Sequence, residues 1–414
     1  MDLHDLARRM TAAALAAVDP ERLARDELTR RGERFGAALA IGKAATPLAR
    51  GAREALEPRA KRLLIRPHNT PGLLDPGWEQ KTGGHPLPDR QSVAAGERLE
   101  RWLGEIPLGA LLALISGGAS ACVEIPAPGL TLEDLVATQR ALLASGLPIQ
   151  KINAVRKHLS RLKGGGALRA TGGRLPRILA LLLSDVPGDD PAAIGSGPFA
   201  ADPTTYAEAL AAVEGLPVPE AVRSHLAAGA RGELPETVKE NPLEVETVLL
   251  GSVRTAVDAA VAEARRHGLH AVDGALEGEA VAAARDLVAR GRSLGGSGIA
   301  LVLGGETTVT LRGETGRGGR NQELALAAAR ELTGSGTELV LTLATDGEDG
   351  PTRSAGGTVD GHTWEAIRRA GIDPETSLAR HDSRTALAAV PGTLLETGPT
   401  GTNVGDLAVY LRLG

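Results

Sequence analysis

The stretch GGETTVTLRGETGRGGRNQE, residues 304–323, is the segment around which this chain is organised. It follows the short apolar run 299–303, which predicts a buried strand. Residues 307–311 are rich in β-branched side chains and predict a second strand. The glycine turn 316–319 then leads into residues 321–329, whose composition strongly favours a helix.

This glycine turn brings Arg317 and Arg320 to the start of the expected helix. Glycines let a backbone approach a ligand closely, and the N–H groups at a helix start favour an anion. An arginine in that place can bind a phosphate or a carboxylate through two hydrogen bonds. The alternative is a surface hairpin turn with solvated arginines, and a motif this short leaves both interpretations open.

The composition is that of a globular protein in a reducing compartment. Apolar residues make up 42% and charged residues 23%, and the net charge of −5 without a basic stripe gives no sign of a nucleic-acid partner. The single cysteine, Cys122, excludes an intramolecular disulfide and a cysteine zinc site. No apolar run has the length of a membrane span, and the N-terminal residues lack a signal-peptide layout. We therefore expect a cytoplasmic protein with no membrane partner.

Strands and helices alternate along the whole chain, which predicts an α/β fold in two domains. The polar, proline-flanked stretch 235–241 indicates the boundary. We expect an N-terminal α/β domain over residues 1–238 and a C-terminal α/β domain over residues 239–414, which a strand at 245–250 would open.

In the first domain, two loops after expected strands and one helix end point to an anionic ligand. Lys43 lies where a strand turns into a helix, which is where open α/β sheets bind ligands, although a solvated loop lysine is the alternative. The sequence Ser-Gly-Gly-Ala-Ser at 116–120 can form an anion-binding nest or simply a tight turn. The expected helix 149–162 carries many cations near its end, which could face an anion or only complement the helix dipole.

Acidic residues follow other strands. Asp185 and Asp189 come after the apolar run 178–183 and offer oxygen ligands for Mg²⁺, although capping of a helix is the alternative for Asp189. Asp346 and Asp349 follow a later strand, in a loop that is too short to be a twelve-residue calcium loop.

This inventory of lysine, arginine, aspartate and glycine suits phosphoryl transfer, which depends on positioning and charge stabilisation. The sequence has no GxGxxG followed by an acidic residue, no GxSxG with triad spacing and no HExxH. It therefore gives no support for a nicotinamide site, a serine hydrolase or a zinc protease.

Eight strings occur in one order along nearly the whole chain and resemble the glycerate 2-kinase family with a C-terminal MOFRL domain. They are IGKAA (41–45), SGGASA (116–121), KHLSRLKGGG (157–166), LSDVPGDDPAAIGSGP (183–198), GGETTVT (304–310), GRGGRNQEL (316–324), ATDGEDGPT (344–352) and TGPTGTNVGDL (397–407). Arg384 is a mild departure, because the resemblance leads us to expect an aromatic residue there.

The resemblance implies a three-layer, Rossmann-like N-terminal domain and a C-terminal domain of MOFRL type, with the active site in an interdomain cleft. It implies a kinase that binds ATP and phosphorylates D-glycerate at the 2-hydroxyl, and we expect Mg²⁺ as the metal. Lys43 matches the family's functional lysine, and Arg320 matches its functional arginine. The sequence leaves the oligomeric state open, and a homodimer is the one assembly that we consider.

From the loops and the resemblance together, the expected catalytic residues are Lys43, Arg320 and Asp346. The residues expected to bind nucleotide or substrate are Ser116, Gly117, Gly118, Ser120, Asp185, Gly188, Glu306, Arg317, Asn321, Thr400 and Asn403. The expected magnesium ligands are Asp185 and Asp189. Two other classes stay open, an NAD(P)-dependent hydroxypyruvate reductase and a non-catalytic sensor of a sugar acid or nucleotide.

Overall fold

The computed structural model describes residues 2–311 and 315–413, and the chain divides into two compact units. The first unit comprises residues 20–250, and the second comprises residues 1–19 together with residues 251–414. These bounds differ from the expected division at residue 238. The N-terminal helix belongs to the second unit, and the strand expected to open the second domain belongs to the sheet of the first.

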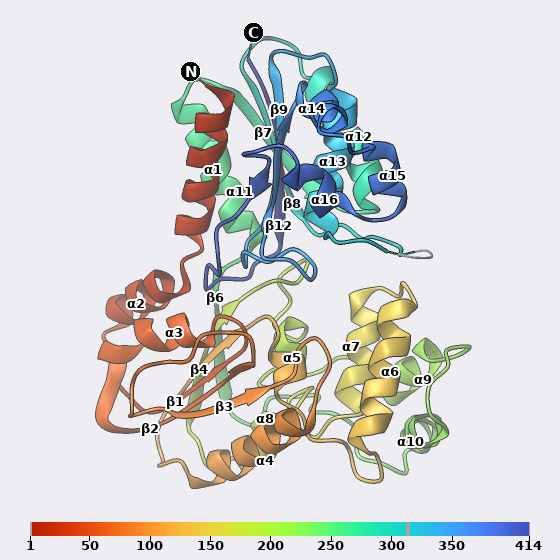
Figure 1. Ribbon diagram of the computed structural model, residues 1–414. Coiled ribbons are helices and arrows are strands. Elements are labelled where there is room, and N and C mark those ends of the chain that lie inside the picture. The colour runs from red at the N-terminus through yellow and green to blue at the C-terminus, as the bar shows by residue number, and fades with distance from the viewer. Residues whose placement is uncertain (1, 312–314, 414) are drawn as a thin grey trace. The chain divides into compact units, whose positions relative to one another are not determined.

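The first unit is built on a six-stranded sheet in the order β3-β2-β1-β4-β5-β6 (Figure 1). The strands from β3 to β5 run parallel to their neighbours. This order reverses between β1 and β4, as in the Rossmann fold, and it confirms the expected Rossmann-like N-terminal domain. The strands are β1 (Phe35–Ile41), β2 (Leu56–Pro67), β3 (Glu79–Gly83), β4 (Leu111–Ser116), β5 (Arg177–Leu183) and β6 (Glu244–Gly251).

Helices cover this sheet because its central strands are apolar on both faces. On one face, alternate side chains of β1 and β2, such as Ile41 and Ile65, share a core with Leu99 and Trp102 of α4. Helix α3 packs against the strands β1, β2 and β4, and α2 packs on α3. The helices are α2 (Pro20–Arg31), α3 (Ala45–Gly51), α4 (Arg90–Glu105), α5 (Ala119–Cys122) and α8 (Gly166–Ala170), with 3₁₀ turns at Arg53–Ala55 and Ile194–Ser196.

A second group of helices in the first unit has a core of its own (Figure 1). It consists of α6 (Leu132–Ala144), α7 (Ile149–His158), α9 (Tyr206–Ala212) and α10 (Glu220–Ala230). Leu142, Val155, Tyr206 and Leu226 are among the buried residues that hold these helices together.

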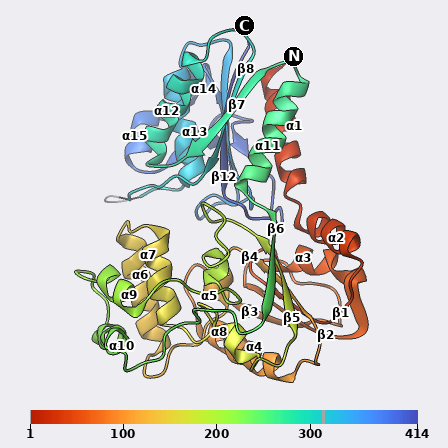
Figure 2. The same cartoon turned by 180° about the vertical axis from the view of Figure 1, so that it is seen from behind.

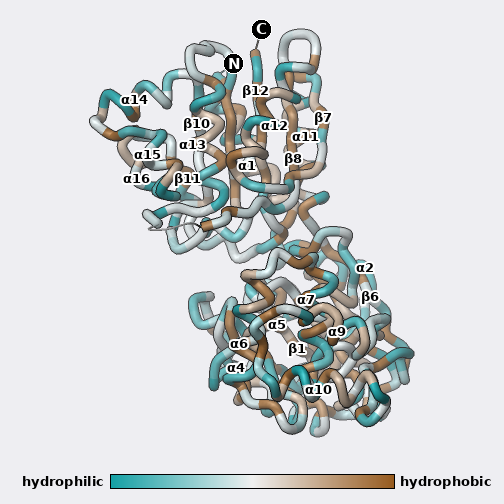
Figure 3. The backbone as a smooth tube through the Cα atoms, turned by 90° about the vertical axis from the view of Figure 1, so that its right-hand side faces the viewer, coloured by the Kyte–Doolittle hydropathy of each residue, from teal (hydrophilic) through white to brown (hydrophobic). Residues whose placement is uncertain are grey.

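The second unit contains a mixed sheet in the order β11-β10-β9-β12-β8-β7. The last strand, β12, lies antiparallel between β8 and β9, so β8 and β9 end at the edge where β12 begins. Figure 3 shows β8 and β12 as strongly apolar segments, as expected for central strands. The strands are β7 (His270–Leu276), β8 (Ile299–Gly305), β9 (Glu338–Ala344), β10 (Gly356–Asp360), β11 (Leu394–Leu395) and β12 (Asp406–Arg412).

Helices form a layer on each face of this sheet. Helices α1 and α11 lie side by side on one face (Figure 2), with Leu6 and Met10 of α1 buried. Helices α12 and α13 cover the other face. The helices are α1 (Leu3–Ala17), α11 (Val253–Arg266), α12 (Ala280–Ser293), α13 (Arg320–Leu332), α14 (Thr363–Arg369), α15 (Pro374–Ala379) and α16 (Ser383–Ala388). No helix among the described residues is both long and apolar enough to cross a membrane.

Two expected elements are wrong. Residues 307–311 form no strand, because the hydroxyls of Thr308 and Thr310 and the N–H of Thr310 bond to the Glu279 carboxylate, and only an isolated bridge joins Thr308 to Glu279. The helix expected over 149–162 ends at His158, and the Arg161 N–H donates to the carbonyl of Ile125 instead. The edge strand β3, and β10, which lies between β11 and β9, have mixed polar sequences and were not expected.

We predict that β6 is part of the stable core of the first unit. Glu246 of β6 forms ion pairs with Arg31 and Arg177, and Val245 packs against the sheet core. A fragment of residues 20–250 should therefore unfold cooperatively, with a higher midpoint in thermal denaturation than a fragment of residues 20–238. Equal midpoints for the two fragments would contradict this assignment of β6.

Candidate active site

The turn after β1 and the loop after β4 are locked together at the carboxyl edge of the first sheet. The Lys43 N–H donates to the Gly117 carbonyl at 2.8 Å, and the Ala44 N–H donates to Ser116 Oγ at 3.0 Å. Gly42 has φ = +115°, and a Cβ there would lie 2.4 Å from Ser116 Oγ. The strand order reverses at this point, so the structure places Lys43 where open α/β sheets bind ligands.

Lys43, Gly118 and His85 come close together beside this turn. A Cβ on Gly118 would lie 3.1 Å from Lys43 Cγ and 3.3 Å from His85 Cδ2, so a larger residue would crowd both side chains. Gly118 also has φ = +83°, a conformation that favours glycine. The N–H groups of Gly118, Ala119 and Ser120 have no acceptor among the described residues. These N–H groups agree with the anion-binding nest that the sequence predicts for residues 116–120.

His85 lies in the loop that follows β3 and was not among the expected site residues. Its loop is fixed to helix α4, since the Gly84 N–H donates to Ser92 Oγ at 2.9 Å and Asp89 caps the helix. His68 lies 2.6 Å from the same Asp89 carboxylate. Burial alone would raise the pKa of Asp89, but hydrogen bonds from His68 and Ser92 lower it below its usual value. His85 can be recognised by its position directly after β3. The sequence did not predict β3, because that strand has no apolar pattern.

The acidic loop after β5 holds the predicted magnesium ligands. Asp185 is half-buried directly after the strand, and Asp189 has a left-handed backbone with φ = +55°. The adjacent Asp190 caps the next turn, with its Oδ1 accepting the Ala192 N–H at 2.9 Å. The described residues contain no group of three or more histidine, cysteine or acidic side chains arranged to hold a metal. Mg²⁺ in kinases usually has one or two carboxylates plus phosphate oxygens, so this loop fits such an ion without a protein cage.

In the second unit, the glycines of the turn 316–319 approach the protein itself. A Cβ on Gly316 would lie 2.2 Å from Asp382 Cβ, and one on Gly319 would lie 2.4 Å from Asp349 Cγ. The backbone of Arg317 is held on both sides, by Asp382 and by the Arg384 N–H, while its side chain is exposed. These glycines therefore serve close packing, where the sequence suggested close approach of a ligand. The neighbouring residues 312–314 lie outside the described part of the chain.

The start of helix α13 already holds an anion, the carboxylate of Asp349. It accepts the Asn321 N–H at 3.1 Å and the Gln322 N–H at 2.8 Å. Burial raises the pKa of Asp349 to about 6, although these two backbone hydrogen bonds lower it. The N–H groups at this helix start, which could bind an external anion, thus bind a side chain from the loop after β9.

Arg320 is paired with two carboxylates of its own unit. Its Nε and Nη2 donate to the two oxygens of Asp406 at 2.5 and 3.1 Å, and its Nη1 pairs with Glu306. Burial by itself lowers the pKa of Arg320, but Asp406 and Glu306 raise it well above its usual value. The sequence placed Arg320 and Glu306 in the site but missed Asp406, which opens β12 in a glycine-rich loop.

The loops after β9 and before β12 are tied together. Thr345 Oγ1 donates to the Gly405 carbonyl and Thr400 Oγ1 donates to the Thr345 carbonyl, both at 2.6 Å. Asp346 is half-buried and accepts the Glu348 N–H at 3.1 Å. Thr400 therefore has a structural hydrogen bond in addition to its predicted ligand contact, and Asn403 lies in the same tied loop.

These features define a class of protein, an α/β fold in which charged and glycine-rich loops gather at the ends of the central strands. Family models match residues 6–227, as a domain of unknown function (DUF4147), and residues 299–406, as the MOFRL family. The chain is 38% identical to a glycerate 2-kinase of Pyrococcus horikoshii, over 99% of this chain and 98% of that protein. It superposes on the crystal structure of a glycerate kinase of Thermotoga maritima with a TM-score of 0.84 and 36% identity, covering 99% of both chains.

The chain belongs to the glycerate kinase family that ends in a MOFRL domain, which confirms the resemblance seen in its motifs. A protein of Agrobacterium vitis that carries a provisional hydroxypyruvate reductase name is also similar, at 39% identity over 98% of this chain and 93% of that protein. That name is a labelling variant within the family. The turn after β1 reads IGKAA, without the glycine spacing of a dinucleotide site.

We predict that Asp349 makes the stability of the second unit depend on pH. The folded unit keeps the Asp349 proton up to about pH 6, whereas the unfolded chain loses it near about pH 4. Its contribution to the free energy of unfolding should therefore fall as the pH rises through this window, by about 3 kcal/mol at most.

The variant Asp349→Asn lacks this proton and should lack this part of the pH dependence. Urea unfolding at several pH values measures it, with Asp258→Asn, an exposed aspartate, as the matched control. If the free energy of unfolding changed with pH to the same extent in wild type and in Asp349→Asn, the assignment of a raised pKa to Asp349 would be wrong.

Proposed function

We propose that this protein transfers the γ-phosphoryl group of ATP to the 2-hydroxyl of D-glycerate. The observation that carries the proposal is the similarity along 99% of the chain to a protein named glycerate 2-kinase. The geometry agrees with this reaction, because Lys43 and a set of N–H groups lie together at the ligand-binding edge of the first sheet.

In the first unit, the N–H groups of the loop 116–120, which contains Ser116, Gly117 and Gly118, would hold phosphate oxygens. Lys43 would stabilise the charge on the transferring phosphoryl group, which spreads over its oxygens in the transition state. Asp185 and Asp189 would hold Mg²⁺, with Gly188 forming the turn between them. When bound, Mg²⁺ neutralises charge on the phosphates.

In the second unit, Arg320 would bind the carboxylate of glycerate or the γ-phosphate, with Arg317 nearby on the same turn. Glu306 is the more exposed of the two carboxylates on Arg320, so an incoming anion would displace Glu306 and leave Asp406 in place. Asp406 then fixes the plane of the guanidinium group. Asn321, Thr400 and Asn403 would make further contacts with nucleotide or substrate.

The chemical step is a direct displacement. The 2-hydroxyl oxygen attacks the γ-phosphorus, the bond from that phosphorus to the bridging oxygen breaks, and ADP leaves. Asp346, or Asp185, would orient the hydroxyl and accept its proton as a weak base. The cytoplasmic location and the homodimer stay predictions, as does the interdomain cleft.

The direct test incubates the protein with D-glycerate, ATP and Mg²⁺ and reads the product by phosphorus NMR. We expect 2-phosphoglycerate with an equal amount of ADP. 3-Phosphoglycerate would overturn the position of transfer, and absence of transfer would overturn the proposal. A parallel reaction with NADH and hydroxypyruvate, followed by absorbance, tests the reductase alternative.

The variant Lys43→Ala should lower kcat by about 10²–10³-fold, because it removes a positive charge that acts on the transition state. The protein should remain folded, since the Lys43 N–H, which anchors the turn, is kept. Steady-state kinetics with circular dichroism measures both effects, and Lys81→Ala, which removes a partly exposed lysine, serves as the control. Near-normal turnover of folded Lys43→Ala would remove Lys43 from the mechanism.

A further inference from the structure

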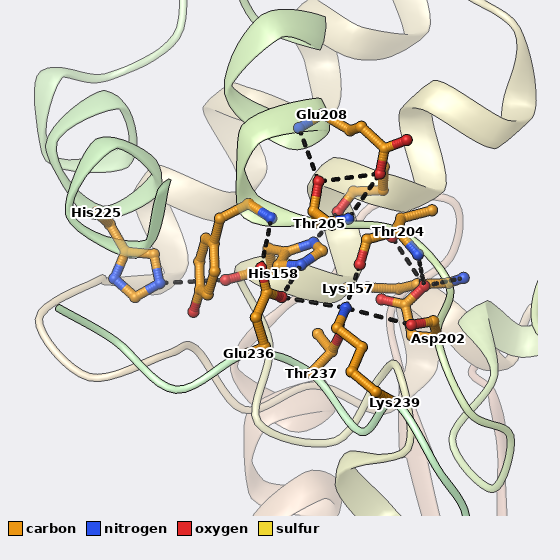
Figure 4. A network of polar contacts seen from close by, with 12 residues as sticks. Lys157, His158, Asp202, Thr204, Thr205, Glu208, His225, Glu236, Thr237 and Lys239 are labelled. Atoms are coloured by element: carbon orange, nitrogen blue, oxygen red, sulfur yellow. Dashed lines mark hydrogen bonds and ion pairs between the residues drawn. The ribbon is translucent and has the colours of Figure 1, made fainter. Parts of the chain in front are cut away.

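The basic residues at the end of helix α7 could face an anion or only complement the helix dipole, and two of them already have acidic partners inside the first unit. Lys157 Nζ lies 3.0 Å from Asp202 Oδ1, and both side chains are almost fully buried. His158 Nε2 lies 3.0 Å from Glu236 Oε2 (Figure 4). Glu236 also accepts the Tyr206 N–H, so this network joins helices α7 and α9 to the segment around residue 236.

Two further cations that follow the helix also have acidic partners. Lys163 is buried against Glu124, which accepts a second hydrogen bond from Ser160 at 2.5 Å. Arg161 pairs with Glu100 of helix α4 at 2.5 Å. All four of these cations therefore have a structural role within the unit.

Arg156 differs from these neighbours, because no carboxylate among the described residues lies within ion-pair distance of it. Its Nε donates to Gln139 Oε1 at 2.8 Å, and its Nη1 donates to Asn153 Oδ1 at 3.3 Å. Burial lowers the pKa of Arg156 to about 10, and the negative charge of Glu124 only partly opposes this. The side chain thus stays charged at neutral pH while neutral amide oxygens hold it, which is costly unless an anion compensates it.

A chain of hydrogen bonds connects Arg156 to the loop after β4. Asn153 Oδ1, which binds Arg156, also accepts the Ser196 hydroxyl at 3.4 Å. Ser196 Oγ lies 2.8 Å from Ser120 Oγ, and Ser120 belongs to the predicted phosphate-binding loop. The polar groups therefore extend without interruption from the guanidinium group to the edge of the sheet.

Ser196, a member of this chain of hydrogen bonds, has an unfavourable backbone conformation. Its φ is +61°, which is uncommon for a residue other than glycine. The Gly164 N–H donates to the Ser196 carbonyl at 3.0 Å, and the Gly165 N–H donates to the next carbonyl at 2.8 Å. The triple glycine at 164–166 thus fixes the position of Ser196, and strain of this kind is often found at functional sites.

We propose that Arg156, Asn153, Ser196 and Ser120 form the binding site for the acceptor, with Arg156 binding its carboxylate and the serines its hydroxyl groups. This rests on the proposed function, since the acceptor there is a hydroxy acid, and of the two anions proposed above for Arg320 it leaves the γ-phosphate. A guanidinium group matches a carboxylate in shape and charge, and hydroxyl and amide groups pair well with hydroxyl groups. A nucleotide phosphate is the other anion that Arg156 could bind, and the test separates the two.

The variant Arg156→Gln removes the charge and keeps a polar side chain. We expect the KM for D-glycerate to rise by about 10- to 100-fold, as for the loss of a hydrogen bond to a charged group, with little change in the KM for ATP. D-Glyceramide, which lacks the carboxylate charge, gives a second measure. Wild type should prefer glycerate over the amide in kcat/KM, and Arg156→Gln should lose most of that preference.

Lys151→Gln is the matched control, because it removes an exposed positive charge from the same helix and should leave both KM values unchanged. Arg156→Lys retains the charge and should restore part of the affinity for glycerate, and thermal melting of each variant verifies folding. An unchanged KM for glycerate in folded Arg156→Gln, or a rise confined to the KM for ATP, would overturn the proposal.

Calorimetric titration with D-glycerate in the absence of ATP separates this inference from the proposed function. Wild type that binds glycerate more tightly than Arg156→Gln would support the acceptor site even if phosphoryl transfer failed. Wild type that turns over glycerate but binds it no more tightly than Arg156→Gln would overturn the site and leave the kinase intact.

Discussion

Parallel strands that end at one edge of a sheet are the constraint on which the first unit depends. Because β1 and β4 are neighbours and their connections leave in opposite directions, the loops after them meet without other chain between them. Gly42 allows the two backbones to touch, and Lys43 and the loop 116–120 are positioned as a consequence. The acidic loop after β5 reaches the same edge because β5 pairs with β4 in register.

In the second unit, the main constraint is that charges buried at the edge where β8 and β9 end must be compensated. Arg320, Asp406 and Glu306 balance one another, and Asp349 occupies the start of helix α13. A buried guanidinium group needs such partners, and burial raises the pKa of the Asp349 and Asp406 carboxyl groups. Because of this charge compensation within the protein, the anion proposed to bind Arg320 has to compete with Glu306.

The first unit shows the same rule and one exception to it. Lys157, His158, Arg161 and Lys163 each have a carboxylate partner, and these pairs hold the end of helix α7 and the residues after it against the rest of the unit. In the sequence these residues are only cations near the end of an expected helix, because spacing along a helix does not reveal what faces each side chain. Only the partners distinguish four structural cations from Arg156.

The sequence by itself determined the two α/β units, the central strands, the Rossmann-like first unit and the loops that carry Lys43, Arg320 and Asp346. Long apolar runs and the glycines after them express local requirements, so a linear reading detects them. Tertiary structure alone decided that α1 and β6 belong to units other than the expected ones, that 307–311 forms no strand, and that Asp406 and His85 lie beside the predicted residues. Those outcomes depend on partners distant in the chain, such as Glu279 for Thr310 and Asp406 for Arg320, and pairing over long separations leaves no periodic trace in the sequence.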